Sequence, residues 1–198
     1  MLVPLIGLGR SFIFRDDNQD PPHVFKCALE RMRCSGTTKA GQQCRRNVIL
    51  HLDKCFQHLK SELGLLTKPS SIPGAGTGLW TVRNWKRGDK IVQYHGEILT
   101  DAELDERYGP GDVTAPYTVE EKKNKHIDAA CNRSTAAFIN HQPNARANTR
   151  FAVSRNPPAV WIVATKNIQA TKDEPRELFI NYGRDYHFNQ PGVSFRTT

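Results

Sequence analysis

The chain has 198 residues, a formal net charge of +8 and a pI of about 9.4, and this length is typical of one domain with a small appendage. It is long enough to bury a core without a framework of disulfides. Its apolar runs fall short of the ~18–20 residues that a membrane span needs. Residues 1–8 are apolar but lack the basic leader of a signal peptide, so we expect neither a span nor a secretory signal.

The positive charge is concentrated in one segment. Residues 26–68 hold nine Lys and Arg against three Asp and Glu, together with four of the five cysteines. Residues 69–198 hold 17 Lys and Arg against 14 Asp and Glu. A concentrated basic patch favours anionic partners, nucleic acid above all. The composition therefore predicts an extension (1–25) and a basic module (26–66) ahead of a nearly balanced globular domain; the motifs described below bound that domain at 68–186 and leave a tail (187–198).

Periodicity predicts the elements in chain order. Apolar residues spaced three or four apart indicate helices near 24–33 and over 45–66, with Gly64 ending the second. A short helix over 101–108 has Asp101 as its candidate cap and ends at Gly109. Strand-like segments lie at 79–85, 90–99, 126–130, 148–154, 159–165 and 177–183. Many short strands and few helices favour an α+β, mainly β domain over alternating βαβ units.

The cysteine-rich module carries a metal-ligand pattern, Cys34-x9-Cys44-x10-Cys55-x2-His58. Two ligands separated by two residues can chelate one ion, and Zn²⁺ accepts thiolate and imidazole in a tetrahedral shell. A structural Zn²⁺ would supply folding energy to a module with little core. The alternative is four unrelated residues, since buried thiols are ordinary core residues. Cys27 and His51 compete for a ligand position, and we expect Cys27 and Cys131 to be plain thiols.

A glycine-rich segment, Gly74-Ala-Gly-Thr-Gly78-Leu-Trp80, is a second candidate site. A dinucleotide cradle requires a strand before such glycines and a helix after them. Here Pro73 precedes the segment and a strand-like run follows, so a Rossmann-type enzyme is disfavoured. Taken alone, the segment is a plain hairpin turn.

Further motifs follow this turn in a characteristic order. They are Tyr94-His-Gly-Glu, Ile127-Asp-Ala, Phe138-Ile-Asn-His with Pro143-Asn, and Glu177-Leu-Phe-Ile-Asn-Tyr-Gly. In this order the chain resembles the SET-domain protein lysine methyltransferases over about residues 68–186. The module resembles a short CCCH-type zinc-binding element of the pattern C…TTK.G..C…C..H. The resemblance implies a SET fold of short curled sheets with a knot-like centre, preceded by a small helical zinc module.

The resemblance also implies a cofactor and a set of site residues. The cofactor would be S-adenosylmethionine, and the residues that would bind it are Gly76, Thr77, Gly78, Leu79, Trp80, Tyr117, Asn140, His141 and Tyr182. Tyr182 and Tyr94 would be catalytic. The lysine channel would be lined by Tyr94, Tyr117, Ile180 and Tyr186. Tyr94 and Tyr117 could instead have no functional role and simply pack in strands, where tyrosine is favoured anyway.

The chemistry of methyl transfer suits these residue types. The reaction is an in-line displacement, so alignment of the amine with the methyl group is the main requirement. The amine must be neutral, and an aromatic channel lowers the pKa of a lysine by desolvation. Three departures from the family pattern are the short link at Gln142, Asn181 in place of Asp, and Ile180 where Phe or Tyr is usual. Ile180 favours di- or trimethylation.

The expected substrate is a protein, with a histone tail as the default class, and the basic module would suit nucleic acid or a nucleosome. We expect no membrane partner, and a nuclear location follows from the reaction alone, with the cytoplasm left open. Two alternatives remain: a non-catalytic SET-fold reader or scaffold, and a methyltransferase acting on a non-histone protein.

Overall fold

The computed structural model describes residues 14–16, 31–49, 52–109, 115, 117–183 and 193–195. These residues form mostly short strands with few helices, so the predicted mainly β class is confirmed. The elements are β1 (Phe14–Asp16), β2 (Arg31–Arg33), β3 (Asn47–Ile49), α1 (Phe56–His58), the π-helical turn η1 (Leu59–Leu63), β4 (Leu65–Pro69), β5 (Thr77–Thr81), β6 (Lys90–Tyr94), β7 (Glu97–Leu99), α2 (Asp101–Tyr108), β8 (Thr118–Lys122), β9 (Lys125–Asp128), the 3-10 turn η2 (Thr135–Phe138), β10 (Asn140–His141), β11 (Thr149–Arg155), β12 (Pro158–Ala164), β13 (Arg176–Glu177), β14 (Phe179–Ile180) and β15 (Val193–Phe195).

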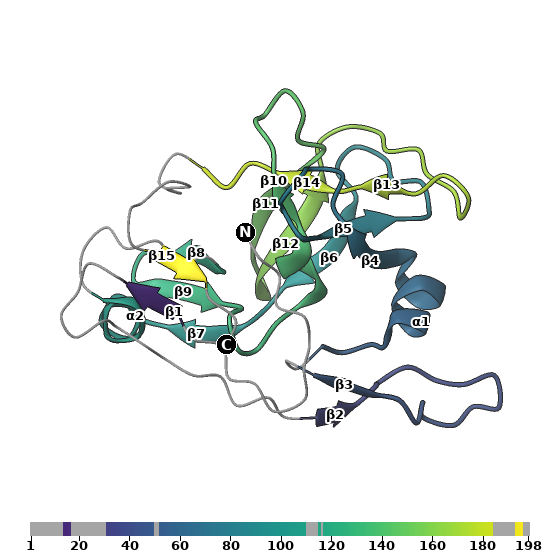
Figure 1. Ribbon diagram of the computed structural model, residues 1–198, viewed down its shortest axis with the longest axis horizontal. Coiled ribbons are helices and arrows are strands. Elements are labelled where there is room, and N and C mark those ends of the chain that lie inside the picture. Colours follow the sequence, from purple (N-terminus) through teal and green to yellow (C-terminus); the bar gives the residue numbers. More distant parts are fainter. Residues whose placement is uncertain are drawn as a thin grey trace.

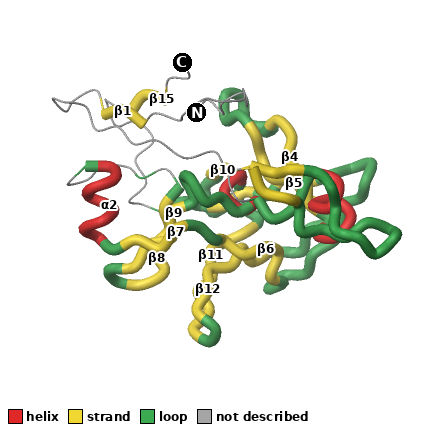
Figure 2. Tube along the Cα trace, turned by 90° about the horizontal axis from the view of Figure 1, so that it is seen from below, coloured by secondary structure: helices red, strands yellow, loops and turns green. Residues whose placement is uncertain are grey.

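The strands are divided among several small sheets (Figure 1). The largest has the order β10-β14-β11-β12-β6, and two three-stranded sheets have the orders β13-β5-β4 and β7-β9-β8. β2 pairs with β3 and β1 pairs with β15, each pair antiparallel. In Figure 2, α2 lies beside the β7-β9-β8 sheet, and the β11–β12 hairpin projects from the body. No helix in the described ranges is long and apolar enough to span a membrane.

One core joins the five-stranded sheet to the β4–β5 sheet. Leu65 and Leu79 from the smaller sheet are fully buried, as are Ile162 and Leu178. All four belong to the same hydrophobic cluster as Tyr94 and Ile180. β4 alternates between buried and exposed residues, whereas β12 is buried over most of its length. Of the candidate site residues, Tyr94 and Ile180 belong to this core, and Tyr117 and Tyr182 pack against it.

The helices differ from the predicted ones in extent. Strand β3 occupies part of the predicted 45–66 helix, and helical residues begin only at Phe56 and end at Leu63. Gly64, with a φ of +67°, ends the helix as predicted. In α2 the cap is Thr100 and not Asp101, because Thr100 and Glu103 form a reciprocal capping box. The T-x-x-E spacing in the sequence carried this signal.

A buried carboxylate ties α2 to the β7-β9-β8 sheet. Asp128 is fully buried and accepts hydrogen bonds from the Arg107 guanidinium (2.7 Å) and the Tyr108 hydroxyl (2.9 Å). Arg107 also pairs with Glu97 at 2.7 Å, and the N–H of Ala130 donates to Asp128 at 2.9 Å. The sheet that carries Tyr117 at its start is therefore held against α2 by charge-assisted bonds shielded from water.

We predict that Asp128→Asn lowers the free energy of unfolding by about 3 kcal/mol, because it removes a buried partner of Arg107. Urea unfolding of the two proteins measures the difference. Glu106→Gln, on the exposed face of α2, is the matched control and should cost less than about 0.5 kcal/mol. Equal losses in the two variants would contradict this role of Asp128.

Candidate active site and metal centre

Three of the four predicted channel residues that the sequence singled out meet in one cavity of about 150 Å³. Tyr94, Tyr117 and Ile180 line it together with Tyr182. Tyr186, also predicted for the channel, lies outside the described residues. The sequence reasoning missed Phe151, whose ring meets Tyr94 edge-on at 5.7 Å; its only signal was an apolar position in a strand.

The hydroxyl groups of Tyr94 and Tyr182 are oriented by the backbone. Tyr94 donates to the carbonyl of Tyr117, and Tyr182 donates to the carbonyl of Ile139, each at 2.7 Å. A carbonyl oxygen can only accept, so each phenol must use its proton in this bond. Burial, followed by the proximity of Tyr182 and Asp128, raises the pKa of Tyr94 well above its usual value. Tyr94 therefore stays neutral and offers oxygen lone pairs to the cavity.

The segment around Asn140 holds the segment around Tyr182. Strand β10 runs parallel to β14, and the N–H of Gln142 donates to the carbonyl of Ile180 at 2.9 Å. The N–H of Tyr182 donates to Nδ1 of His141 at 3.1 Å, with the two rings 5.3 Å apart. Burial lowers the pKa of His141, which keeps the imidazole in the neutral form that can accept this bond.

The predicted cofactor residues Gly76 to Trp80 lie in and beside β5, and Asn140 joins them. The side-chain amide of Asn140, which is 4% exposed, donates to the carbonyl of Thr77 at 3.2 Å. The indole N–H of Trp80 is buried without a hydrogen-bond partner among the described residues. The glycine-containing backbone of β5, the buried amide of Asn140 and the indole N–H of Trp80 together offer the polar groups that a ligand would need on this side of the domain.

Glu177 positions the glycine-rich segment. The sequence marked Glu177 only as the first residue of a motif and did not indicate this positioning role. Its buried carboxylate accepts hydrogen bonds from the Ser70 hydroxyl (2.6 Å) and from the Ser71 N–H (2.7 Å) and hydroxyl (2.6 Å). A Cβ on Gly78 would lie 2.2 Å from Oε1 of Glu177. Gly78 is therefore required where the carboxylate passes the strand, and the glycines of this segment need no phosphate ligand to explain them.

A second, larger cavity of about 720 Å³ meets the first at Phe151 and Tyr182. Its walls are more polar and include Asn144, Arg150 and Asn181. The Asn181 amide donates to Asn144 at 2.8 Å, and its oxygen accepts the N–H of Gly183 at 2.9 Å. Asn181, which departs from the family pattern, thus bridges the two segments that flank Tyr182. A ligand in either cavity would contact the same tyrosine.

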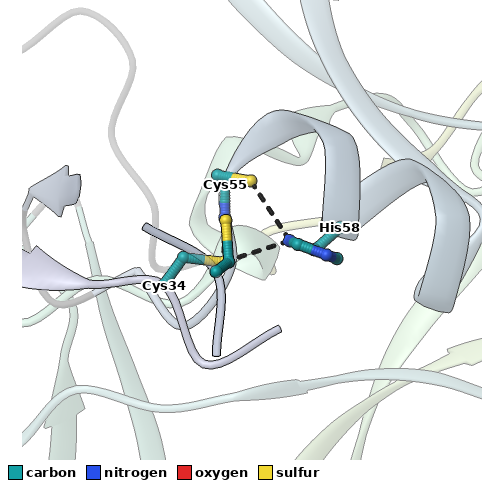
Figure 3. Close-up of side chains that lie close together, drawn as sticks. Cys34, Cys55 and His58 are labelled. Atoms are coloured by element: carbon teal, nitrogen blue, oxygen red, sulfur yellow. Dashed lines mark hydrogen bonds between the residues drawn. The ribbon is translucent and has the colours of Figure 1, made fainter. Parts of the chain in front are cut away.

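The four predicted metal ligands form one cluster (Figure 3). The sulfur atoms of Cys34, Cys44 and Cys55 and a ring nitrogen of His58 all lie within 4.8 Å of one another. Nδ1 of His58 is 3.4 Å from the sulfur of Cys34 and 3.4 Å from that of Cys55. Three thiols and an imidazole at this spacing fit a tetrahedral Zn²⁺ site.

The surroundings of the cluster also suit a metal. Nε2 of His58 donates to the carbonyl of Thr37 at 3.1 Å, which leaves Nδ1 as the free lone pair facing the sulfurs. A Cβ on Gly36 would lie 2.3 Å from the His58 ring, so a glycine is needed there. Burial raises the pKa of Cys55, but hydrogen bonds from the backbone of His58 and of Gln57 act against burial and lower it.

Cys131 is not part of this cluster. Cys131 is disulfide-bonded, so the expectation that it is a plain thiol is wrong, while its exclusion from the ligand set is consistent with the cluster found. Cys27 and His51, the two competing ligands, lie outside the described residues. Thiol spacing alone could not separate a disulfide cysteine from a free one, because pairing depends on which segments the fold brings together.

Comparisons with known proteins agree with this geometry. The sequence model of the family described as SET domain matches residues 76–183. The N-lysine methyltransferase KMT5A of Xenopus tropicalis is 30% identical over 139 residues, which is 67% of this chain and 39% of that protein. The histone-lysine N-methyltransferase EZH2 of Chaetomium thermophilum is 22% identical over 165 residues, 77% of this chain and 10% of the relative. The chain thus spans well under half the length of either relative.

One solved structure supports the fold. A humanized mutant of the Chaetomium thermophilum Polycomb Repressive Complex 2 aligns with a TM-score of 0.50 and 21% identity, covering 62% of this chain and 15% of the compared chain. At this identity the likeness concerns the fold alone.

We predict that Gly78→Ala lowers the free energy of unfolding by about 1–3 kcal/mol, because the new methyl group overlaps the Glu177 carboxylate. Thermal unfolding measures the loss. Adding Glu177→Asp, whose carboxylate is one methylene shorter, should restore part of the stability. If the double variant is less stable than the sum of the two single changes, the proposed overlap is wrong.

Proposed function

Because the chain belongs to the SET-domain family, we propose that it is a protein lysine N-methyltransferase that uses S-adenosylmethionine. The observation that carries the proposal is the tyrosine-lined cavity, where Tyr94, Tyr117 and Tyr182 converge beside Ile180. The names of the relatives support the same activity. A histone tail is the proposed substrate class and the nucleus the proposed location.

S-adenosylmethionine, when bound, supplies a methyl group on a positively charged sulfur. We assign its binding to the backbone of Gly76 to Trp80 and to Asn140 and His141. The Asn140 amide already touches this backbone at Thr77, and the unpaired indole N–H of Trp80 is a further donor. The Glu177 carboxylate fixes the loop that leads into the segment.

Tyr182 and Tyr94 align the substrate amine. Their hydroxyl protons point to backbone carbonyls, so their oxygens accept hydrogen bonds from the amine and direct its lone pair. The apolar walls, including Phe151 and Ile180, exclude water and lower the pKa of a lysine, which favours the neutral amine. Because burial raises the pKa of Tyr94, its phenol stays uncharged and gives an ammonium no counter-ion. Ile180 adds no hydroxyl, which supports di- or trimethylation.

We predict that Tyr182→Phe lowers the turnover number about a hundredfold, because the amine loses an aligning acceptor. Transfer of tritiated methyl groups to histones, nucleosomes and a cell lysate measures it. Val153→Ala is the control, since Val153 is exposed on β11 and is not among the residues that line the cavity, so it should leave turnover unchanged. Unchanged methylation of every substrate by Tyr182→Phe would contradict the assignment. If the unsubstituted chain transfers no methyl group to any substrate, the result would favour the alternative of a non-catalytic reader or scaffold.

His141 positions Tyr182 through its ring, which yields a paired prediction. The Asn side chain places its oxygen near the position of Nδ1, whereas the Gln side chain places its amide near Nε2. His141→Asn should therefore retain most of the turnover number, and His141→Gln should lose it about as far as Tyr182→Phe. Steady-state kinetics with both variants test this. Equal turnover in the two variants would show that the Tyr182 N–H bond is unimportant.

We further propose that the Cys34–His58 cluster binds one structural Zn²⁺ and that its basic module recruits the enzyme to nucleic acid or chromatin. Three thiols and an imidazole nitrogen within 4.8 Å support the metal, and the charge surplus of residues 26–68 supports recruitment. Tethering raises the local concentration of substrate without changing the chemistry.

Replacing Cys34 and Cys55 together by Ser should abolish zinc binding, because two of the four ligands are lost. Elemental analysis of the purified chain measures zinc per molecule. His126→Asn is the control, since His126 bonds Asp101 on α2, outside the cluster, and should retain one zinc. A double variant that still holds one zinc per chain would refute the site.

A further inference from the structure

The module exposes an aromatic ring beside its metal-ligand cluster. Phe56, the first residue of α1, is 68% exposed, and the Arg46 guanidinium lies 5.1 Å from its ring centroid. Arg46 also contacts the side chain of Gln57. Leaving a ring of this size in water forgoes burial that would stabilise the fold. We call the surface of Phe56, Arg45, Arg46 and Lys60 the Phe56 face.

The cluster holds this face rigid. Phe56 directly follows Cys55 and precedes His58 by two residues, so two of the four cluster residues bracket it. On the neighbouring segment, the N–H of Arg46 donates to the sulfur of Cys44 at 3.5 Å. The ring and the guanidinium are therefore set in place before any partner arrives, which lowers the entropic cost of binding.

Within the part of the chain that the structure describes, no acidic side chain pairs with the basic residues of this face. In the described part of the module, the carboxylate of Glu62 forms an ion pair with Nζ of Lys54 at 2.6 Å. Among the described residues, no ion pair involves Arg45, Arg46 or Lys60, and all three are exposed. Lys60 follows Phe56 by four residues along the same helical stretch, which places it near the same side.

The opposite end of the molecule carries the opposite charge. Helix α2 exposes Asp101, Glu103, Asp105 and Glu106, and Glu120 on β8 is also exposed. Figure 1 places α2 and the module at opposite ends of the long axis. A long anion is therefore attracted to the module and repelled from the α2 end.

We propose that the Phe56 face binds single-stranded nucleic acid, with one unpaired base stacked on Phe56 and the flanking phosphates on Arg45, Arg46 and Lys60. Basic side chains interleaved with an exposed ring are the arrangement that tracks a single strand, because every base has a face that can stack. A duplex hides its base faces, so it would use only the charges. This binding gives the proposed recruitment a site and a ligand, and it does not require methyl transfer.

The test is fluorescence anisotropy with the full chain, without cofactor, on labelled oligouridylate, oligothymidylate and a duplex RNA. The expected result is tighter binding of the single strands than of the duplex at equal salt. Phe56→Ala should weaken single-strand binding at least about fivefold without changing its salt dependence, whereas Phe56→Trp should retain it. Arg45→Gln should reduce the slope of log K against log salt by about 0.7. The two single strands distinguish RNA from DNA as the source of the strand.

Met32→Ala is the matched control, because Met32 is an exposed apolar residue of the same module, on β2, and lies outside the Phe56 face. It should leave binding unchanged. Zinc content equal to that of the parent confirms that each variant is folded. Equal affinity for duplex and single strand with no effect of Phe56→Ala would overturn the proposal. So would competition by oligoglutamate as effective as that by oligouridylate, since it would indicate an acidic protein surface as the partner.

Discussion

The pairing of β10 with β14 is the constraint on which the candidate active site depends. These strands are each two residues long and come from segments about forty residues apart, yet they run parallel at one edge of the five-stranded sheet. The pairing brings Ile139 and His141 onto Tyr182, which they hold at its hydroxyl and at its N–H. Neither bond could form from local sequence, so the position of the tyrosine is a product of the whole fold.

Two buried carboxylates fix the segments that surround the β10–β14 pair. Glu177 fixes the segment before the glycine-rich strand, and Asp128 fixes α2 against the sheet beside Tyr117. Each accepts three hydrogen bonds or more, and each is close to a glycine whose missing Cβ makes room, Gly78 at the Glu177 side chain and Gly96 at the Asp128 backbone. Gly78 and Gly96 therefore serve close packing of chain against chain.

The sequence predicted the class of fold, the order of the motifs and the grouping of Cys34, Cys44, Cys55 and His58, because these depend on residue identity at short spacing or on an ordered group of motifs. It did not predict β3, whose apolar residues Val48 and Ile49 also match a helical period. It missed Phe151 and the roles of Glu177 and His141, because partners far apart in sequence define them. The disulfide at Cys131 was missed for the same reason.

Charge is distributed unevenly between the module and the rest of the chain. Most of the basic surplus lies in the module, whereas the cavity is lined mainly by tyrosines and apolar side chains, together with Thr118 and Glu120. The most direct test of the account is to incubate the chain with tritiated S-adenosylmethionine and core histones, and to identify the labelled amino acid after hydrolysis. The account predicts label in N-methylated lysine. Absence of label from lysine in histones, nucleosomes and whole-cell lysate alike would contradict it.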